Sequence, residues 1–329
     1  MAIPTISAGP AVTTAGPARP TDPPRPARAS ARRRRNRGAL LIWAFVAPAL
    51  VVYTTFVLVP VALAAVYSFF NWNGLGALDR FIGIDNYTRA LTDPVFLNAM
   101  LHNGGIVVLS LVVQGPLAIA IALLLNRPLK GRALIRTLIF VPYVLSEVVA
   151  GLSFRLILPP GGPLDAMLTA VGWTGEKPLW LADPAVAFWT LFAVITWKYL
   201  GFAIILMLAG LQGVPEELGE AAAIDGASWW QTQRHITLPL LGPTIRIWAF
   251  LSVIGSLQLF DMVFILTGGG PLNSTETMAT YMVEYGNGRS QIGYGSAVAV
   301  VLFVVSLVIA LLYQRFVLRR DLAGAITRG

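Results

Sequence analysis

Six apolar stretches, each close to the length of a membrane-spanning helix, dominate this sequence. The first covers residues 39–70 and holds 32 residues without a charged side chain. About 20 apolar residues cross the hydrocarbon of a bilayer as a helix. The runs are unbroken and lack the two-residue alternation of barrel strands, so we expect helices. We place the spans at about Leu40–Val66, Gly104–Asn126, Leu134–Leu158, Ala185–Leu211, Thr244–Thr267 and Ala297–Phe316.

The composition also indicates a membrane protein. Charged residues make up 12% of the 329 residues, whereas a soluble domain usually holds about 25%. There is no cysteine, and the two histidines, His102 and His235, are far apart in the chain. These counts exclude disulfides, iron–sulfur clusters and thiolate zinc sites, and we expect no metal site.

Residues 1–38 differ from the rest of the chain because they contain seven prolines and eight arginines. Such a segment buries too little apolar surface to offset its ordering entropy, so we expect a disordered basic cytoplasmic tail. Arg32 to Arg37 directly precede the first span. Retention of the N-terminus in the cytoplasm, next to membrane lipid, explains them better than nucleic-acid binding does. We therefore expect a tail at 1–38, a six-span domain at 39–320 and a short cytoplasmic tail at 321–329.

The distribution of basic residues predicts the orientation. Of the 24 lysines and arginines, eighteen fall in the tails and connections of one side, five fall on the other, and Lys198 lies inside a span. The positive-inside rule then places both termini and the loop 212–243 in the cytoplasm.

The stretch Glu216–Pro239 is the longest polar interval between two spans on that side. We expect two short amphipathic helices, broken at Asp225-Gly226, with Pro215 opening the first. Ser228 is expected to cap the second helix and Pro239 to end it.

The second of these helices is expected to turn Trp229, Trp230 and Ile236 outward, where they need a cover. Lipid headgroups are one candidate. However, the loop holds four acidic side chains against Arg234 and a histidine, which is the wrong sign for anionic lipid. We therefore expect a protein partner.

Several motifs resemble one known family. EAAAIDGA at 220–227, followed by ITLP at 236–239, resembles the EAA loop of ABC-importer permeases. FIGIDNYTRALTDPVF at 81–96, QLFD at 258–261, LTGGGP at 266–271 and GYGSA at 293–297 resemble the carbohydrate-uptake permeases of the maltose and glycerol-phosphate type. The match covers about residues 39–320 and departs from the family at Gln233, where an aromatic residue is usual.

The resemblance implies an all-α integral membrane protein with six transmembrane helices and cytoplasmic EAA coupling helices, the ABC importer permease fold. It implies a cytoplasmic membrane protein of a prokaryote that translocates a carbohydrate, from mono- to oligosaccharide, by alternating access. The implied partners are a second permease subunit in a heterodimer, two ATP-binding subunits and an extracytoplasmic solute-binding protein. The residues implied to couple to the ATPase are Glu216, Glu217, Glu220, Ala221, Ala222, Asp225, Gly226, Ala227, Trp229, Trp230 and Pro239.

The chain contains no G-x-x-x-x-G-K-[ST] motif for binding ATP phosphates. We therefore expect a transport subunit that is not an enzyme and binds no cofactor, with ATP and Mg²⁺ held by separate ATPase subunits. No nucleophile–base pair, metal motif or cofactor motif supports a membrane enzyme.

Three charged side chains, Glu147, Lys198 and Asp261, fall inside predicted spans. A charge in mid-bilayer costs about 2.5 kcal/mol or more, so each is a functional candidate. Lys198 could pair with either acid to hold helices together, or the three could line a pathway. As an alternative, they could form the relay of an ion-coupled secondary carrier.

A sugar pathway needs hydrogen-bonding groups and aromatic faces at mid-membrane depth. Gln258 and Asp261 are three residues apart and are expected to share a helix face. Pro142 and Gly201 allow bending of spans three and four, and Gly115-Pro116 is expected to kink span two. The candidate pathway residues are Tyr143, Ser146, Glu147, Trp197, Lys198, Tyr199, Gln258, Phe260 and Asp261.

Overall fold

The computed structural model describes residues 43–127 and 130–318, together with Gly9 and Gly16. The predicted tails, 1–38 and 321–329, otherwise lie outside the described residues. The chain divides into two units, residues 1–60 and 61–329. In the first unit, the described residues from Trp43 onward are helical and include the π-helical turn Thr54–Leu58. They open the candidate span Trp43–Tyr67, which ends with α2 (Val59–Tyr67).

The second unit consists of helices, and its described residues contain no strand beyond an isolated bridge between Phe70 and Phe81. The helices are α3 (Asp85–Thr92), α4 (Pro94–Leu109), α5 (Gly115–Leu125), α6 (Arg132–Val144), α7 (Glu147–Ile157), α8 (Pro163–Ala170), α9 (Pro184–Leu211), α10 (Glu216–Ile224), α11 (Trp229–Thr232), α12 (Leu238–Leu257), α13 (Asp261–Leu266), α14 (Met278–Val283) and α15 (Ile292–Tyr313). Further π-helical turns lie at Ser110–Gln114, Gln233–Thr237, Glu284–Gly288 and Gln314–Leu318.

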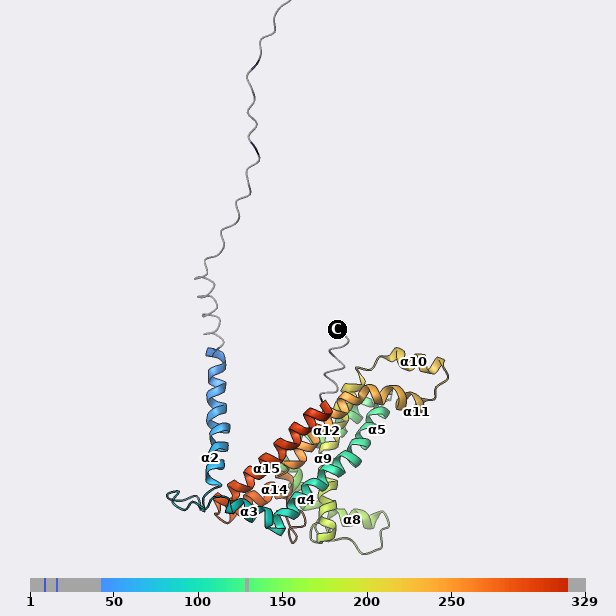
Figure 1. Cartoon of the computed structure of the whole chain (residues 1–329). Helices are drawn as coiled ribbons and strands as arrows, with labels where there is room; N and C mark the ends of the chain where they lie inside the picture. Colours follow the sequence, from blue (N-terminus) through green and yellow to red (C-terminus); the bar gives the residue numbers. More distant parts are fainter. Residues whose placement is uncertain (1–8, 10–15, 17–42, 128–129, 319–329) are drawn as a thin grey trace, which may run out of the picture. The chain divides into compact units, whose positions relative to one another are not determined.

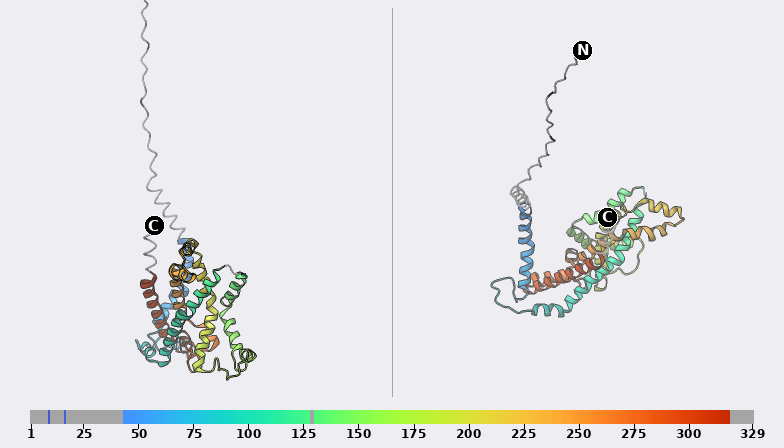
Figure 2. Two further views of the ribbon diagram at one scale, coloured as in Figure 1. Left: turned by 90° about the vertical axis from the view of Figure 1, so that its right-hand side faces the viewer. Right: turned by 45° about the horizontal axis from the view of Figure 1, so that its top comes forward.

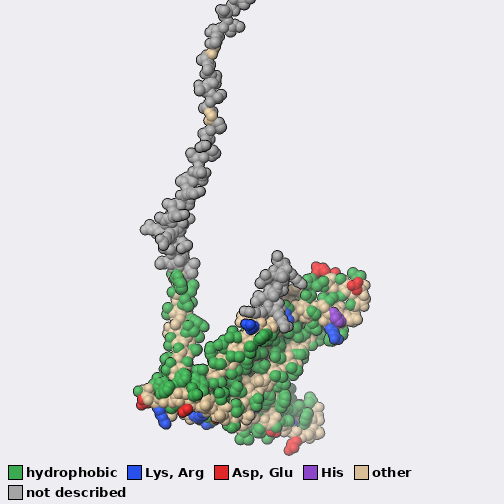
Figure 3. Space-filling view, in the orientation of Figure 1, with side chains coloured by type: hydrophobic (Ala, Val, Ile, Leu, Met, Phe, Trp, Pro, Cys, Tyr) green, Lys and Arg blue, Asp and Glu red, His purple; other side chains and the backbone are tan. Residues whose placement is uncertain are grey.

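Within this unit α4, α5, α9, α12 and α15 run side by side (Figure 1). One end of the unit carries α10 and α11, and the opposite end carries α3 and α8; the two further views show the same arrangement (Figure 2). We call these the α10 end and the α8 end. On the visible face, hydrophobic side chains cover the middle of the helices, and charged side chains gather toward the two ends (Figure 3). This distribution suits a protein that crosses a bilayer.

Five helices of the described chain are long and apolar enough to cross a membrane. They are Trp43–Tyr67, Pro94–Leu125, Pro184–Leu211, Trp229–Leu257 and Ile292–Leu318. The pair α6 and α7, bent by 95°, raises the number to six if it counts as one span. The helical class is as predicted and each predicted span overlaps an observed helix, but span three is broken near its middle.

The prediction for the fifth span was wrong at its end. The helix stops at Leu257, ten residues before Thr267, and α13 is a separate short helix. Side chains from other segments donate hydrogen bonds to the carbonyl groups at this end. Asn103 Nδ2 donates to the carbonyl of Ser256 at 2.6 Å, and Thr277 Oγ1 donates to the carbonyl of Leu259 at 2.9 Å. The apolar run alone contains no sign of these partners.

Three prolines inside the candidate spans follow π-helical turns. Pro60, Pro116 and Pro239 each lie two residues after such a turn. Proline has no N–H and its ring crowds the preceding turn, and the wider π-helical turn accommodates both defects without ending the helix. The kink predicted at Pro116 and the helix end predicted at Pro239 are therefore π-helical irregularities inside continuous helices.

Helix α9 packs against α5, α6 and α12. Ala118 and Ala122 of α5 and Ala203 of α9 are fully buried, and such small residues let membrane helices approach closely. At Gly201, an added Cβ would lie 2.2 Å from the carbonyl oxygen of Ile139 in α6. Helix α9 runs unbroken through Gly201, and this glycine permits a close helix contact.

Candidate functional site

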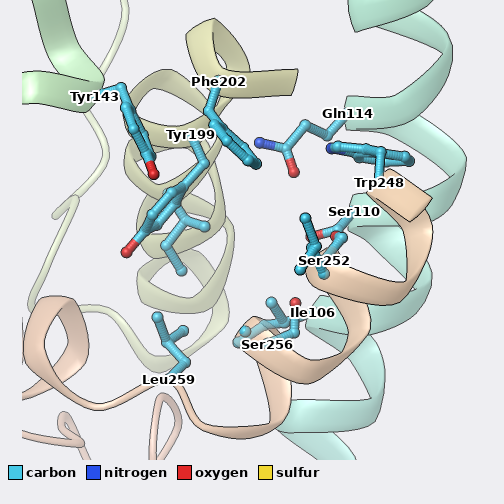
Figure 4. Close-up of a pocket in the computed structure, with 13 residues that line it drawn as sticks. Ile106, Ser110, Gln114, Tyr143, Tyr199, Phe202, Trp248, Ser252, Ser256 and Leu259 are labelled. Carbon is cyan, nitrogen blue, oxygen red and sulfur yellow. The ribbon is translucent and has the colours of Figure 1, made fainter. Parts of the chain in front are cut away.

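A cavity of about 300 Å³ lies between the helices of the second, third, fourth and fifth candidate spans (Figure 4). This volume lies at the lower end of the range that is usual for small-molecule sites. The cavity is lined by Ile106, Ser110, Gln114, Tyr143, Ile195, Tyr199, Phe202, Trp248, Leu251, Ser252, Gly255, Ser256 and Leu259. None of these lining residues is charged.

Aromatic rings form two walls of the cavity. Tyr143 of α6 stacks on Phe202 of α9, with ring centroids 4.9 Å apart and an interplanar angle of 21°. Tyr199 lies one helical turn from Phe202 and meets Tyr143 edge to face. Trp248 of α12 lies on the other side (Figure 4), where it packs so closely on α5 that a Cβ at Gly115 would lie 2.6 Å from its ring.

Polar groups complete the lining. Ser110 and Gln114 bound the π-helical turn between α4 and α5, while Ser252 and Ser256 come from α12. Gln114 is 4% exposed, and its Nε2 has no hydrogen-bond partner among the described residues. In Figure 4 its amide points into the cavity toward Phe202. A buried donor without a partner is costly, so this amide is ready to bond to a molecule in the cavity.

The structure brings only part of the predicted pathway to this cavity. Tyr143 and Tyr199 line it. Ser146 is exposed and caps α7, and Trp197 faces a separate apolar groove beside Phe154. Phe260 stacks on Phe264 and does not line the cavity, although its neighbour Leu259 does.

The expectation that Gln258 and Asp261 share a helix face was wrong. Gln258 is the C-cap of α12, whereas Asp261 begins α13. Both side chains are exposed. The helix break between them, described above, removes the three-residue periodicity on which the expectation depended.

Lys198 and Glu147 lie behind the aromatic wall. Lys198 is 2% exposed, and its Nζ lies 3.6 Å from Glu147 Oε1. Of the two acidic partners considered for Lys198, the structure therefore pairs it with Glu147. Lys198 Nζ also donates to the carbonyls of Pro142 at 3.1 Å and Tyr143 at 3.0 Å, and to that of Leu145. Asp261 lies outside this group.

Sequence reasoning missed most of the polar lining. Trp248, Ser252 and Ser256 follow one another at four-residue intervals and so share one face of a helix. Ser110 and Gln114 are also four residues apart. A search for such polar stripes inside apolar runs would have found both sets, whereas charge alone directed attention to Lys198 and Asp261.

The 216–239 loop lies at the α10 end. As predicted, it forms two helical segments broken at Asp225 and Gly226, where Gly226 has a φ of +80°. Ser228 caps the second segment in a capping box with Gln231, as predicted. Pro215 is the N-cap of α10, so the helix begins at Glu216, one residue after the predicted start.

The loop exposes both acidic and apolar side chains. Glu216, Glu217 and Glu220 are exposed, as are Ile224 and Trp230. Trp229 is partly covered, because the Arg127 guanidinium lies 4.2 Å from the centroid of its ring. Ile236 is partly buried, which corrects the expectation that it turns outward.

The coupling residues predicted from the resemblance all lie in this loop. Ala222 is the one buried residue of α10, while Ala221 is exposed. Ala227 follows the helix break and is partly buried. Pro239 lies within the continuous helix Trp229–Leu257. One helix therefore connects the loop to Trp248, Ser252 and Ser256 of the cavity.

Among the residues that the structure describes, no group of three His, Asp or Glu side chains is placed to hold a metal ion. Asp165 is an acidic residue outside the spans whose pKa is lowered. Asp165 of α8 accepts hydrogen bonds from Trp180 Nε1 and the Gly161 N–H, and these bonds, the Trp180 bond first, lower its pKa. They fasten α8 to the connection that leads to α9.

Residues 114–321 match the family model described as "Binding-protein-dependent transport system inner membrane component". The chain is similar to the multiple sugar-binding transport system permease protein of Streptococcus mutans, with 35% identity over 270 residues, 82% of this chain and 92% of the relative. It is also 35% identical, over 286 residues, to the lactose transport system permease protein of Rhizobium radiobacter, covering 85% and 94% of the two chains.

Among solved structures, the chain resembles a subunit of a bacterial ABC transporter involved in the import of the acidic polysaccharide alginate. The TM-score is 0.76 at 25% identity, and the match covers 87% of this chain and 98% of that one. The arrangement of helices described above is therefore that of an ABC importer permease.

Proposed function

Because the chain belongs to the family of binding-protein-dependent transport system inner membrane components, we propose that it is a permease subunit that moves a carbohydrate across the cytoplasmic membrane. The observation that carries the proposal is the cavity between the second to fifth spans. It combines aromatic faces with serine hydroxyls and an unpartnered amide, and it contains no charged lining residue.

This lining fits the chemistry of a neutral sugar. The C–H faces of a pyranose stack on aromatic rings such as Tyr143 and Trp248, and its hydroxyls bond to serine and glutamine side chains. Relatives named for lactose and for multiple sugars support the same substrate class. The size of the cavity favours one or two sugar units at a time.

The energy source in this proposal is a pair of ATP-binding subunits that dock on the 216–239 loop. The exposed Glu220, Ile224 and Trp230 offer acidic and apolar contacts for such a partner. ATP-driven closure of the ATPases would pull on this loop, and the helix Trp229–Leu257 would carry the movement to the cavity. A second permease subunit would complete the pathway, and an extracytoplasmic binding protein would deliver the sugar at the α8 end. In this orientation the α10 end and both termini face the cytoplasm.

The test is uptake of the sugar that the partner binding protein selects in a thermal-shift screen. We expect Glu220→Lys and Gly226→Pro to abolish uptake while the chain still reaches the membrane. Glu220→Lys reverses a docking charge, and proline cannot adopt the φ of +80° at Gly226. Lys130→Glu is the matched control, because it reverses an exposed charge that lies outside the 216–239 loop and away from the α8 end.

Wild-type uptake and normal ATPase co-purification in both loop variants would refute the docking role. Uptake that continues without any ATPase and collapses with the proton gradient would instead establish the ion-coupled carrier, with Glu147, Lys198 and Asp261 as its candidate relay.

A further inference from the structure

Span three is broken between α6 and α7, and Lys198 of α9 occupies the break. We propose that Lys198 is a positioning residue. Its ammonium group caps the free carbonyls at the end of α6 and so holds the aromatic wall of the cavity in place. The importance of this wall for transport rests on the proposed function, whereas the capping role itself does not.

The end of α6 leaves backbone carbonyls without helical partners. Helix α6 stops at Val144, α7 begins at Glu147, and the two helices are bent by 95°. In such a break the last carbonyls of the first helix have no N–H four residues later. Lys198 Nζ donates to the carbonyls of Pro142, Tyr143 and Leu145. An ammonium group has three donors, so these bonds use all of them.

A lysine fits this position for a second reason. The C-terminal end of a helix carries partial negative charge, which a cation offsets. Inside a bilayer no water solvates free carbonyls, so a broken span persists only where other protein groups satisfy its backbone. Lys198 is 2% exposed, so the carbonyls and the nearby Glu147 replace its own hydration.

The packing of α9 on α6 brings the lysine to the break. Gly201 lies three residues after Lys198 and therefore on the same helix face. At Gly201 the backbones of α9 and α6 are in contact, since a Cβ there would overlap the Ile139 carbonyl. This close contact keeps the end of α6 within reach of the Lys198 side chain.

Glu147 has a different role on the other side of the break. Its Oε1 accepts a hydrogen bond from the Tyr199 hydroxyl at 2.9 Å, whereas Lys198 Nζ lies farther away, at 3.6 Å. Two consecutive residues of α9 thus hold the two sides of the break: Lys198 holds the end of α6, and Tyr199 holds the start of α7. The carbonyl of Tyr143 is bonded to Lys198 while its ring stacks on Phe202 in the cavity.

Cysteine accessibility tests this role directly, because the chain contains no cysteine. Gly255→Cys provides the reporter: Gly255 lines the cavity, and an added Cβ there meets nothing within 4 Å. The measured quantity is the rate at which a charged, water-soluble methanethiosulfonate reagent modifies this cysteine in membranes containing the full chain and its partner subunits. The modification rate is measured without ATP and without the sugar, so the test remains valid if the transport proposal fails.

We expect Lys198→Met to change the modification rate about tenfold or more, because each hydrogen bond to a charged group accounts for about that factor. Glu147→Gln keeps an acceptor for Tyr199 and should change the rate less. Lys177→Met is the matched control, since Lys177 is a partly exposed lysine outside the spans, and it should stay within about twofold.

An unchanged rate in Lys198→Met would overturn the proposal. So would an equal or larger change in Glu147→Gln, because the ion pair would then be the main interaction. If Lys198→Met does not accumulate in the membrane, Lys198→Arg decides the matter. Arginine keeps donors for the carbonyls, so we expect accumulation and a rate near that of the parent, and failure of this variant as well would refute capping.

Discussion

The contact between α6 and α9 at Gly201 leads to a quantitative prediction. Replacing Gly201 by alanine places a Cβ 2.2 Å from the carbonyl oxygen of Ile139 and 3.2 Å from the Cα of Phe140. A carbon and a carbonyl oxygen approach no closer than about 3.3 Å. Both obstructing atoms belong to the backbone, so no side-chain rotation relieves the overlap. The two helices must therefore move apart by about 1 Å.

Such overpacking costs about 1–3 kcal/mol. Alanine is the better helix former by about 1 kcal/mol, which offsets part of the cost. We therefore expect Gly201→Ala to lower the free energy of unfolding by up to about 2 kcal/mol. Because the displaced segment of α6 leads to the carbonyls that Lys198 caps, the variant should also increase reagent access at Gly255→Cys.

The measurement is reversible unfolding of the purified chain in mixed micelles of a mild detergent and SDS. Gly104→Ala is the matched control: Gly104 also lies within a span helix, but a Cβ there meets nothing within 4 Å. We expect this control to be neutral or to gain up to about 1 kcal/mol. Equal unfolding free energies for the two alanine variants would refute the inferred backbone contact between α6 and α9.

Three further predictions concern the ends of the molecule. Hydrogen bonds, that from Trp180 first, lower the folded-state pKa of Asp165 below its ordinary value of 3.8. The stabilisation from this carboxylate is therefore present at neutral pH and is lost as the pH falls through the folded-state pKa. Asp165→Asn should make the α8 segment sensitive to protease at neutral pH, and equal digestion of parent and variant would contradict this. Arg127→Gln removes the cation–π contact with Trp229, and such a contact contributes about 0.5–1 kcal/mol at an exposed site. Backbone amide hydrogen exchange should therefore accelerate across residues 229–237, and an unchanged exchange rate would refute the contact. Gly269 has a φ of +85°, and a Cβ there would overlap the buried carboxylate of Glu276. Gly269→Ala should therefore sharply reduce the amount of folded chain in the membrane, and normal accumulation on a membrane blot would contradict this.

The elements of the fold were largely predictable from the sequence. Long apolar runs without the alternation of barrel strands cross a bilayer as helices, so each predicted span overlaps an observed helix. A local signal also gave a reliable helix start: Ser228 caps α11 through a side-chain oxygen that accepts a backbone N–H. These features depend on residues close together in the chain.

Features that depend on distant residues were not predictable in this way. The end of α12 depends on Asn103, which lies 153 residues before the carbonyl it bonds. Gly201 was taken for a point of flexibility, because a single glycine in a helix indicates bending as readily as close packing. Only the position of the Ile139 backbone distinguishes these two roles.

The candidate site was predicted less completely for a related reason. Charge identified Lys198 and Glu147, but both serve the wall of the cavity and not its lining. The uncharged Gln114 and Ser256 do line it. A buried charge in a membrane protein is satisfied first by the nearest protein groups, so it often marks the support of a site. The Gln114 amide lies at the site itself, and its Nε2 has no hydrogen-bond partner among the described residues.

Three backbone irregularities border the same cavity. These are the π-helical turn Ser110–Gln114, the break after Val144 and the helix end at Leu257. In a bilayer, irregular backbone is tolerated where it is buried in protein or lines a cavity, because only there can its free polar groups find partners. Irregularities of separate spans at one place therefore have a common cause in the site that they surround. In this chain Gln114, Gly115 and Pro116 stand together deep in an apolar run, and Gln114, at the end of the π-helical turn, lines the cavity.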